Sequence, residues 1–514
     1  MASKNSFLII LCVLSLISGC VSLPTIENHQ HRQMAIVDTD STTRLGKALK
    51  AETDEHPGKS GVTLLQNPRD AFVDRLMLTE LAESSIDLQY YIWWDDISGT
   101  ILYDALIRAA NRDVRIRLLL DDNNTRELDS KLWMLNEHPN IYVRLFNPNQ
   151  YRNHRLWGLF TNFARLNKRM HNKSFTIDNQ ATIVGGRNIG DEYFEVNDDF
   201  LFQDLDVLAV GKVVEDVSND FDLYWNSAYA YPLESLIKKK HVSVEKLTQK
   251  SAALTTDNKA EAYITSLRES SLAQEMMNRE LELIWCDVTL ISDSPRKVGK
   301  RSERKDLITF QLTELIGSPE KELVLVSPYF VPGRNGTNFL IDLAESGINI
   351  TVLTNSFEAT DVMAVHSGYV KRRKKLLKAG IKLYELKRES GTIPMEEERG
   401  FTSSKASSLH AKTFVVDHDR VFVGSFNFDQ RSFFLNTEMG FLIEHEELTG
   451  FISDTIQNQS GYRAYEVRLT PKNNLHWIQR SSDSYKVITK EPGIGFWNNV
   501  GLKILHLLPI EWML

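Results

Sequence analysis

Cysteine is scarce in this chain of 514 residues, which contains only three. Two of them, Cys12 and Cys20, lie in an N-terminal apolar segment, so Cys286 is the only cysteine in the rest of the chain. A framework of intrachain disulfides is therefore excluded. The length also excludes a small stapled scaffold and predicts two or more domains.

Basic residues are also fewer than acidic residues. The chain has 60 Lys+Arg against 68 Asp+Glu, a net charge of −8, so no global positive field draws it toward nucleic acid or anionic lipid. Any such attraction must be local. Hydrophobic residues make up 42% and charged residues 25%, which is ordinary for a soluble globular protein and excludes wholesale disorder.

The N-terminus carries an apolar run, residues 7–17 (FLIILCVLSLI), that is too short to span a bilayer comfortably. It ends in Ile17-Ser18-Gly19-Cys20, which resembles the lipobox of bacterial lipoproteins. The resemblance implies a signal peptide over 1–19, a lipid anchor on Cys20 and a position on the periplasmic side, with Val21 favouring the outer membrane. An uncleaved signal anchor and a plain secretory peptide are the alternatives.

A long internal repeat follows a polar stretch, residues 20–64, that we interpret as a tether. Each copy contains a strand, a Gly-Thr pair that opens a helix, and a second strand. The two Gly-Thr pairs begin at Gly99 and Gly336, an offset of 336 − 99 = 237. The predicted elements are 85–92, 101–111 and 114–120 in the first copy, and 323–327, the helix from Gly336 and 348–353 in the second.

Strands that alternate with helices predict an α/β architecture with helices on both faces of each sheet. The duplication predicts two pseudo-symmetric αβα repeats packed together, with one active site at their interface. We place the repeats at 65–235 and 306–445, a connecting segment at 236–305, and a C-terminal extension at 446–514.

One motif occurs in both copies in the same frame. Residues 171–178 read HNKSFTID and are followed after six residues by GGRN (185–188), whereas 410–417 read HAKTFVVD and are followed after six residues by GSFN (424–427). The offset, 410 − 171 = 239, agrees with that of the larger repeat. Two copies in register are a strong signal, although a single copy could arise by chance.

Each motif predicts a hairpin whose polar side chains gather at one end. Side chains alternate along a strand, so the histidine and lysine of a motif project the same way and its aspartate has the opposite parity. Gly186 and Ser425 remove bulk where the returning strand ends, which lets an anionic ligand approach the backbone. Asn188 and Asn427 are donors nearby.

Two imidazoles, two ammonium groups and two amides that converge on one pocket suit a phosphodiester. A neutral histidine can attack phosphorus, while the opposite, protonated histidine gives its proton to the departing alcohol. The lysines and asparagines would neutralise the phosphate oxygens. This chemistry requires no metal and no cofactor.

The paired motifs resemble those of the phospholipase D superfamily, over residues 65 to 445. The resemblance implies that His171 is the nucleophile that forms a phosphohistidine and that His410 is the general acid and then the base, although these roles could be exchanged. It also implies a structural role for the motif aspartates Asp178 and Asp417. The phosphate-binding positions that it implies are Lys173, Lys412, Asn188 and Asn427.

Each histidine should have an acidic partner that fixes its tautomer. Glu438, at 438 − 410 = 28 residues after His410, resembles the family's partner for that histidine. For His171 the local pattern favours Asp204, at 204 − 171 = 33 residues, with Asp206 and Asp199 as alternatives. A further pair, Asp121-Asp122, follows a predicted strand, and we interpret it as turn chemistry and not as a metal site.

Several stretches resemble the short bacterial cardiolipin synthases: 169–173, 185–194, 329–333 and 508–511. This implies transfer of a phosphatidyl group to an alcohol of another phospholipid, commonly phosphatidylglycerol, with phosphatidylethanolamine as a possible co-substrate. Water as acceptor would give phospholipase D hydrolysis. A nuclease is the alternative enzyme, which the acidic balance disfavours, so no nucleic-acid partner is expected. An inactive lipid-binding protein is the alternative of another class, but binding alone does not require two complete motifs.

The expected partners are a phospholipid substrate and a membrane surface. An apolar residue recurs every four positions near the C-terminus, which is typical of an interfacial helix but also of an ordinary docked one. The stretches 296–305 and 371–378 are rich in basic residues. We interpret the first as a solvated loop and the second as a solvated helix face, with lipid headgroup binding as the alternative for each. The oligomeric state is not specified. The residues of the C-terminal pattern are Phe496, Val500, Ile504 and Leu508, with Trp497 and Trp512 as interfacial anchors.

Overall fold

The computed structural model describes residues 23, 34–35, 42–194, 204–238, 281–299, 302–360, 362–388, 409–481, 484–495, 498, 500–502, 505 and 511–514. The predicted signal peptide and anchor, Asp199 and most of the predicted C-terminal interfacial helix lie outside these ranges. Within them, every helix is too short or too polar to traverse a bilayer.

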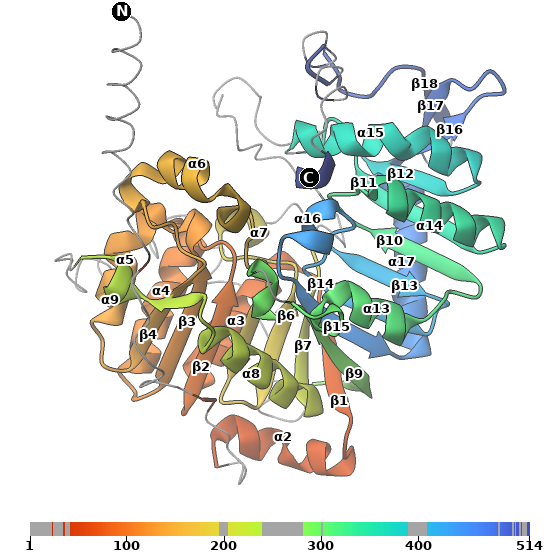
Figure 1. Cartoon of the computed structure of the whole chain (residues 1–514). Coiled ribbons are helices and arrows are strands. Elements are labelled where there is room, and N and C mark those ends of the chain that lie inside the picture. Colours follow the sequence, from red (N-terminus) through yellow and green to blue (C-terminus); the bar gives the residue numbers. More distant parts are fainter. Residues whose placement is uncertain are drawn as a thin grey trace, which may run out of the picture.

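Each half of the molecule is built on one mixed sheet (Figure 1). In the first sheet, β2, β3 and β4 are parallel and the strands from β5 onward are antiparallel to their neighbours. Its order is β8 (Ala230–Pro232), β4 (Ile141–Phe146), β3 (Arg115–Asp121), β2 (Ser85–Tyr90), β5 (Ser174–Ile177), β6 (Ala181–Gly185), β7 (Asp206–Gly211) and β1 (Ser60–Leu65).

The second sheet repeats this order, so the duplication seen in the sequence is a structural one. Its order is β18 (Tyr485–Ile488), β17 (Leu475–Arg480), β16 (Ala464–Leu469), β12 (Lys382–Leu386), β11 (Asn349–Asn355), β10 (Glu322–Val326), β13 (Thr413–Val416), β14 (Arg420–Gly424), β15 (Met439–Glu444) and β9 (Ile284–Ser292).

Strand β9 joins the two halves. Its residues 287–292 pair with β15 and its first residues, 284–286, pair with β1, where Cys286 lies opposite Ser60. This strand falls within residues 236–305, which we interpreted as a connecting segment. In the second sheet it occupies the position that β1 occupies in the first sheet. Strands β16 to β18, which fall in the C-terminal extension, extend the second sheet beyond β12.

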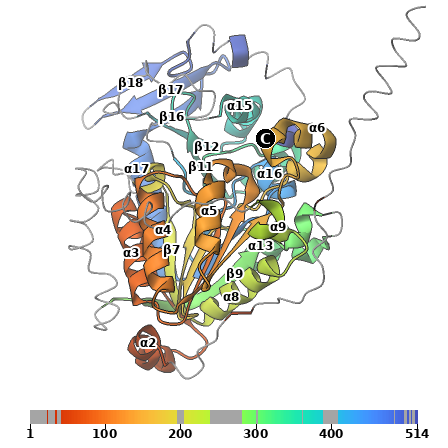
Figure 2. The ribbon, with the colours of Figure 1, turned by 90° about the vertical axis from the view of Figure 1, so that its left-hand side faces the viewer.

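Helices cover both faces of the first sheet (Figure 2). Because side chains alternate along β3, Leu118 and Leu120 pack in the core beneath α3 (Pro68–Leu81) and α4 (Ile97–Ala110). Leu119 points the other way and packs with Phe221 of α8 (Lys212–Trp225). Helix α4 begins before the predicted residue 101, because the side chain of Asp96 caps it by accepting from the N–H of Gly99 at 3.0 Å.

The second half is covered in the same way by α13 (Ile308–Ile316), α14 (Gly333–Glu345), α15 (Met363–Lys378) and α17 (Glu446–Arg463). A shared apolar core holds the halves together. It contains Val184 and Val207 of the first sheet and Val423 and Phe441 of the second, all fully buried. The predicted α/β repeats packed face to face are therefore confirmed.

Candidate active site

Both motif histidines lie at the carboxyl ends of parallel strands. Strand β5 runs antiparallel to β2, with Ser174 opposite Gln89, and β13 runs antiparallel to β10, with Thr413 opposite Val326. The residues just before β5 and β13 therefore lie beyond the carboxyl ends of β2 and β10. That edge is where open α/β sheets bind their ligands.

Backbone hydrogen bonds tie the first motif to the second half. The N–H of His171 donates to the carbonyl of Thr437 at 2.8 Å, and the N–H of Thr437 donates to the carbonyl of Arg169 at 2.9 Å. The side chain of Thr437 also donates to Asn172 at 2.7 Å. These contacts bring the residue after Thr437, Glu438, against the first motif.

Each histidine is bonded to a carboxylate of the opposite half. Nδ1 of His171 lies 2.8 Å from Oε2 of Glu438, and Nδ1 of His410 lies 2.5 Å from Oδ2 of Asp204. The expectation that Glu438 serves His410 and that Asp204 serves His171 was therefore wrong. The number of residues between a histidine and a carboxylate does not show which half of the molecule that carboxylate faces. Here each carboxylate bonds the histidine of the other half.

The other acidic candidates have different partners. Asp206 forms a buried ion pair with Arg75 at 2.7 Å. Asp121 accepts from the N–H of Met170 at 2.8 Å, and Asp122 is paired with Arg152. Throughout the described ranges, no three His, Cys, Asp or Glu side chains are grouped so that they could hold a metal ion.

Two hydroxyls hold the carboxylate of Glu438. Ser425 donates to Oε2 at 2.5 Å and Ser432 donates to Oε1 at 2.9 Å. Ser425 was predicted to bind substrate, and in the structure its hydroxyl touches the carboxylate that orients His171. Ser432 was not predicted, because it belongs to the short helix α16 (Gln430–Phe434) and to no motif.

Glycine is required at position 186 by the other carboxylate. A Cβ at Gly186 would collide with Oδ1 of Asp204. We expect Gly186→Ala to push this carboxylate away from His410 and to lower turnover by about 10²-fold, since a small misplacement of a catalytic group has effects of that size. Steady-state kinetics measure the loss. Gly450→Ala is the control, because the described part of the chain places no atom within 4 Å of its Cβ position apart from its chain neighbours and its own helix backbone, and an equal loss there would contradict the argument.

The two motif lysines lie beside the imidazoles. Nζ of Lys173 donates to the carbonyl of His171 at 2.6 Å. Nζ of Lys412 donates to the carbonyl of His410 and lies 2.9 Å from its Nδ1. Burial lowers the pKa of Lys173 to about 7, so a nearby anion is needed to hold its full charge.

The two motif asparagines are buried at the same site. Oδ1 of Asn188 accepts from the N–H of Ile92 at 3.2 Å, which orients that amide. Oδ1 of Asn427 is buried and has no hydrogen-bond partner among the residues that the structure describes. Two aromatic rings that were not predicted flank the histidines: Tyr91 lies 5.0 Å from the ring of His171, and Tyr193 lies 5.3 Å from that of His410.

The electrostatics of the two pairs differ. Burial, then the charges of Lys173 and Lys412, lower the pKa of His171 well below its usual value, so this ring is neutral. Burial also raises the pKa of its partner Glu438. At Asp204, burial alone would raise the pKa, but His410 and Lys412 outweigh it and hold the pKa below its usual range. Asp204 therefore stays ionised.

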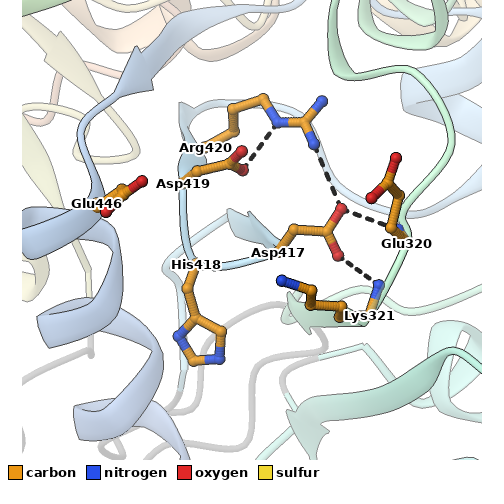
Figure 3. Close-up of a pocket in the computed structure, with 7 residues that line it drawn as sticks. All are labelled: Glu320, Lys321, Asp417, His418, Asp419, Arg420 and Glu446. Atoms are coloured by element: carbon orange, nitrogen blue, oxygen red, sulfur yellow. Dashed lines mark hydrogen bonds and ion pairs between the residues drawn. The ribbon is translucent and has the colours of Figure 1, made fainter.

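The motif aspartates are turn residues at the other end of the hairpins. Asp178 and Asp417 have φ of +50° and +53° and begin tight turns. The carboxylate of Asp178 accepts from the backbone N–H groups of 83–85, and that of Asp417 accepts from those of 320–322. Figure 3 shows Asp417 in a polar surface pocket. The strand β13 separates this pocket from His410.

Comparison with known proteins gives consistent matches. The family model described as cardiolipin synthase, phospholipase D-like domain, matches residues 77–225 and 312–459. Cardiolipin synthase C of Escherichia coli (strain K12) is 43% identical over 92% of this chain and 100% of its own length. The major cardiolipin synthase of Bacillus subtilis (strain 168) is 26% identical over 75% of this chain and 65% of its own length.

Among solved structures, the crystal structure of phosphatidylserine synthase from Haemophilus influenzae Rd KW20 superposes with a TM-score of 0.55. It is 13% identical and covers 92% of this chain and 100% of that one. At this identity the likeness concerns the fold, and both chains share the same α/β architecture.

Proposed function

This chain belongs to the phospholipase D-like cardiolipin synthase family, and from that membership and its site we propose that it transfers phosphatidyl groups through a phosphohistidine intermediate. The observation that carries the proposal is the crossed arrangement of His171 with Glu438 and of His410 with Asp204. In each pair the carboxylate takes Nδ1, which leaves Nε2 for the reacting groups.

The first half-reaction uses the neutral ring. Nε2 of His171 attacks the phosphorus of a donor phospholipid, and the bond from phosphorus to the departing alcohol breaks. His410, whose imidazolium is stabilised by the ionised Asp204, gives that alcohol its proton. The ammonium groups of Lys173 and Lys412 and the amides of Asn188 and Asn427 stabilise the phosphate oxygens.

The second half-reaction reverses these roles. His410 takes the proton of an acceptor hydroxyl, the oxygen attacks phosphorus, and the bond to Nε2 of His171 breaks. With the hydroxyl of phosphatidylglycerol as acceptor the product is cardiolipin, from phosphatidylglycerol or phosphatidylethanolamine as donor. With water the product is phosphatidic acid. The similarity to cardiolipin synthase C supports the lipid acceptor.

A substrate panel tests this proposal. Purified protein is incubated with phosphatidylglycerol, phosphatidylethanolamine and single-stranded DNA, with and without EDTA, and the products are separated. We expect diphosphatidyl lipid or phosphatidic acid in wild type, unchanged by EDTA and lost in His171→Ala. Nuclease products without lipid turnover would instead support the nucleic-acid alternative.

We also propose that the protein acts at a membrane surface on the periplasmic side, held there by a lipid on Cys20. The support is the lipobox-like sequence that ends at Cys20 and the phospholipid substrate of the proposed reaction.

A further inference from the structure

Helix α6 (Arg155–Leu166) exposes an unusual amount of apolar surface. Phe160 is 83% exposed, Leu156 72% and Trp157 55%, and Leu159 and Phe163 are exposed as well. Only Gly158 and Leu166 of this helix are buried. Contiguous exposed apolar side chains of this size mark an interaction site, whereas single exposed ones are ordinary.

The helix is held in place despite its small buried face. A Cβ at Gly158 would collide with the amide of Asn149, so glycine lets the helix lie close to that side chain. The amide of Asn149 donates to the carbonyl of Arg155 at 3.1 Å. At the other end, Arg431 of α16 donates to the carbonyl of Asn167 at 2.7 Å. The apolar side chains are therefore presented by an anchored element.

The helix lies at the edge of the sheet that carries the site. It follows the carboxyl end of β4, and its last residue is 171 − 166 = 5 positions before His171. Its neighbour Arg431 lies on the same short helix as Ser432, which bonds Glu438. Both Figure 1 and Figure 2 show α6 at the end of the molecule opposite α2 (Arg44–Glu55).

The charge around α6 favours an anionic surface. Residues 151–169 contain four arginines and one lysine and no aspartate or glutamate. Arg152, Arg155 and Arg169 pair with aspartates outside this segment, so Arg165 and Lys168 are the cations whose described contacts are to uncharged groups. Arg165 donates to the amide oxygens of Asn147 and Gln150, and Lys168 donates to backbone carbonyls. Arg165 is two positions after the exposed Phe163, and cations beside apolar side chains are typical of interfacial helices.

We propose that α6 docks the protein on an anionic phospholipid bilayer, with Leu156, Trp157 and Phe160 in the boundary between headgroups and acyl chains. This inference rests on the proposed function, because a phospholipid donor must be presented to His171 from a lipid surface. Docking by α6 places the headgroups at the edge of the sheet where the histidines lie.

The double variant Trp157→Ser/Phe160→Ser tests the docking role in the full chain. Turnover is measured on vesicles of phosphatidylglycerol and phosphatidylcholine, and on a short-chain phosphatidylglycerol below its micelle concentration. We expect the variant to lose about tenfold or more on vesicles and to keep the wild-type rate on the monomeric lipid, which also shows that it folds. Phe451→Ser on α17, where the ring is 51% exposed, is the matched control and should change neither rate.

Quenching of tryptophan fluorescence by brominated lipids separates this inference from the reaction itself. We expect Trp157→Phe to lose a quenched component that the wild type shows on vesicles. Wild-type turnover of vesicles by the double variant, with no change in quenching, would overturn the docking role. If the wild-type protein turns over neither lipid while the fluorescence of Trp157 is quenched, the proposed phosphatidyl transfer is wrong and the docking role of α6 is supported. A change in oligomeric state with vesicle turnover intact would assign α6 to a second copy and overturn it.

Discussion

We expect His171→Ala to lower phosphatidyl transfer by about 10⁴-fold or more, because in the proposed reaction the covalent intermediate forms on this ring. The ring is neutral, its Nδ1 is bonded to Glu438, and its Nε2 is left for phosphorus. Initial rates on phosphatidylglycerol vesicles measure the loss. His418→Ala is the matched control, since this half-exposed histidine pairs with Glu322 at the far end of β13.

A substrate with an activated leaving group distinguishes the two histidines. A p-nitrophenyl phosphodiester loses its leaving group without a proton from the enzyme. We therefore expect His410→Ala to release nitrophenol in the first half-reaction, whereas His171→Ala releases none. Release by His171→Ala and not by His410→Ala would exchange the two roles.

Asp204→Asn lowers turnover by about 10² to 10⁴-fold, a loss of the kind expected when the acidic partner of a catalytic histidine becomes an amide. The carboxylate lies 2.5 Å from Nδ1 of His410 and is ionised. An amide at this position removes the charge that stabilises the imidazolium. Asp216→Asn on α8 is the control, because its carboxylate is exposed and pairs only with a surface lysine in the contacts that the structure describes.

The pH profile shows which histidine Asp204 serves. Burial, then Lys412, lower the pKa of His410 below its usual value, although Asp204 raises it. His410 must be protonated to act as the acid, so activity falls as pH rises through its pKa. Asp204→Asn lowers that pKa, and the alkaline limb of the profile should move to lower pH. A shift confined to the acid limb would mean that Asp204 acts on His171, contrary to the crossed pairing.

The hairpins and the repeat could be predicted because they depend on local pattern. The apolar strands, the turn at Asp178 and the equal spacing of the two motifs are set by residues close together in the chain. Strand β9 was not predicted as part of the sheet. Its neighbours β15 and β1 lie far from it in sequence, and nothing in its own residues indicates them.

By itself, the sequence determined the groups of the proposed site: two histidines, two lysines and two asparagines, each at the same place in a duplicated hairpin. Only the tertiary structure decided how they are oriented. The hydrogen bonds from His171 to Glu438 and from His410 to Asp204 span 267 and 206 residues. Such contacts depend on how the two sheets dock. The tertiary structure also decided that the apolar face of α6 is exposed, because an apolar helical pattern does not specify whether that face packs on a core or contacts a lipid surface.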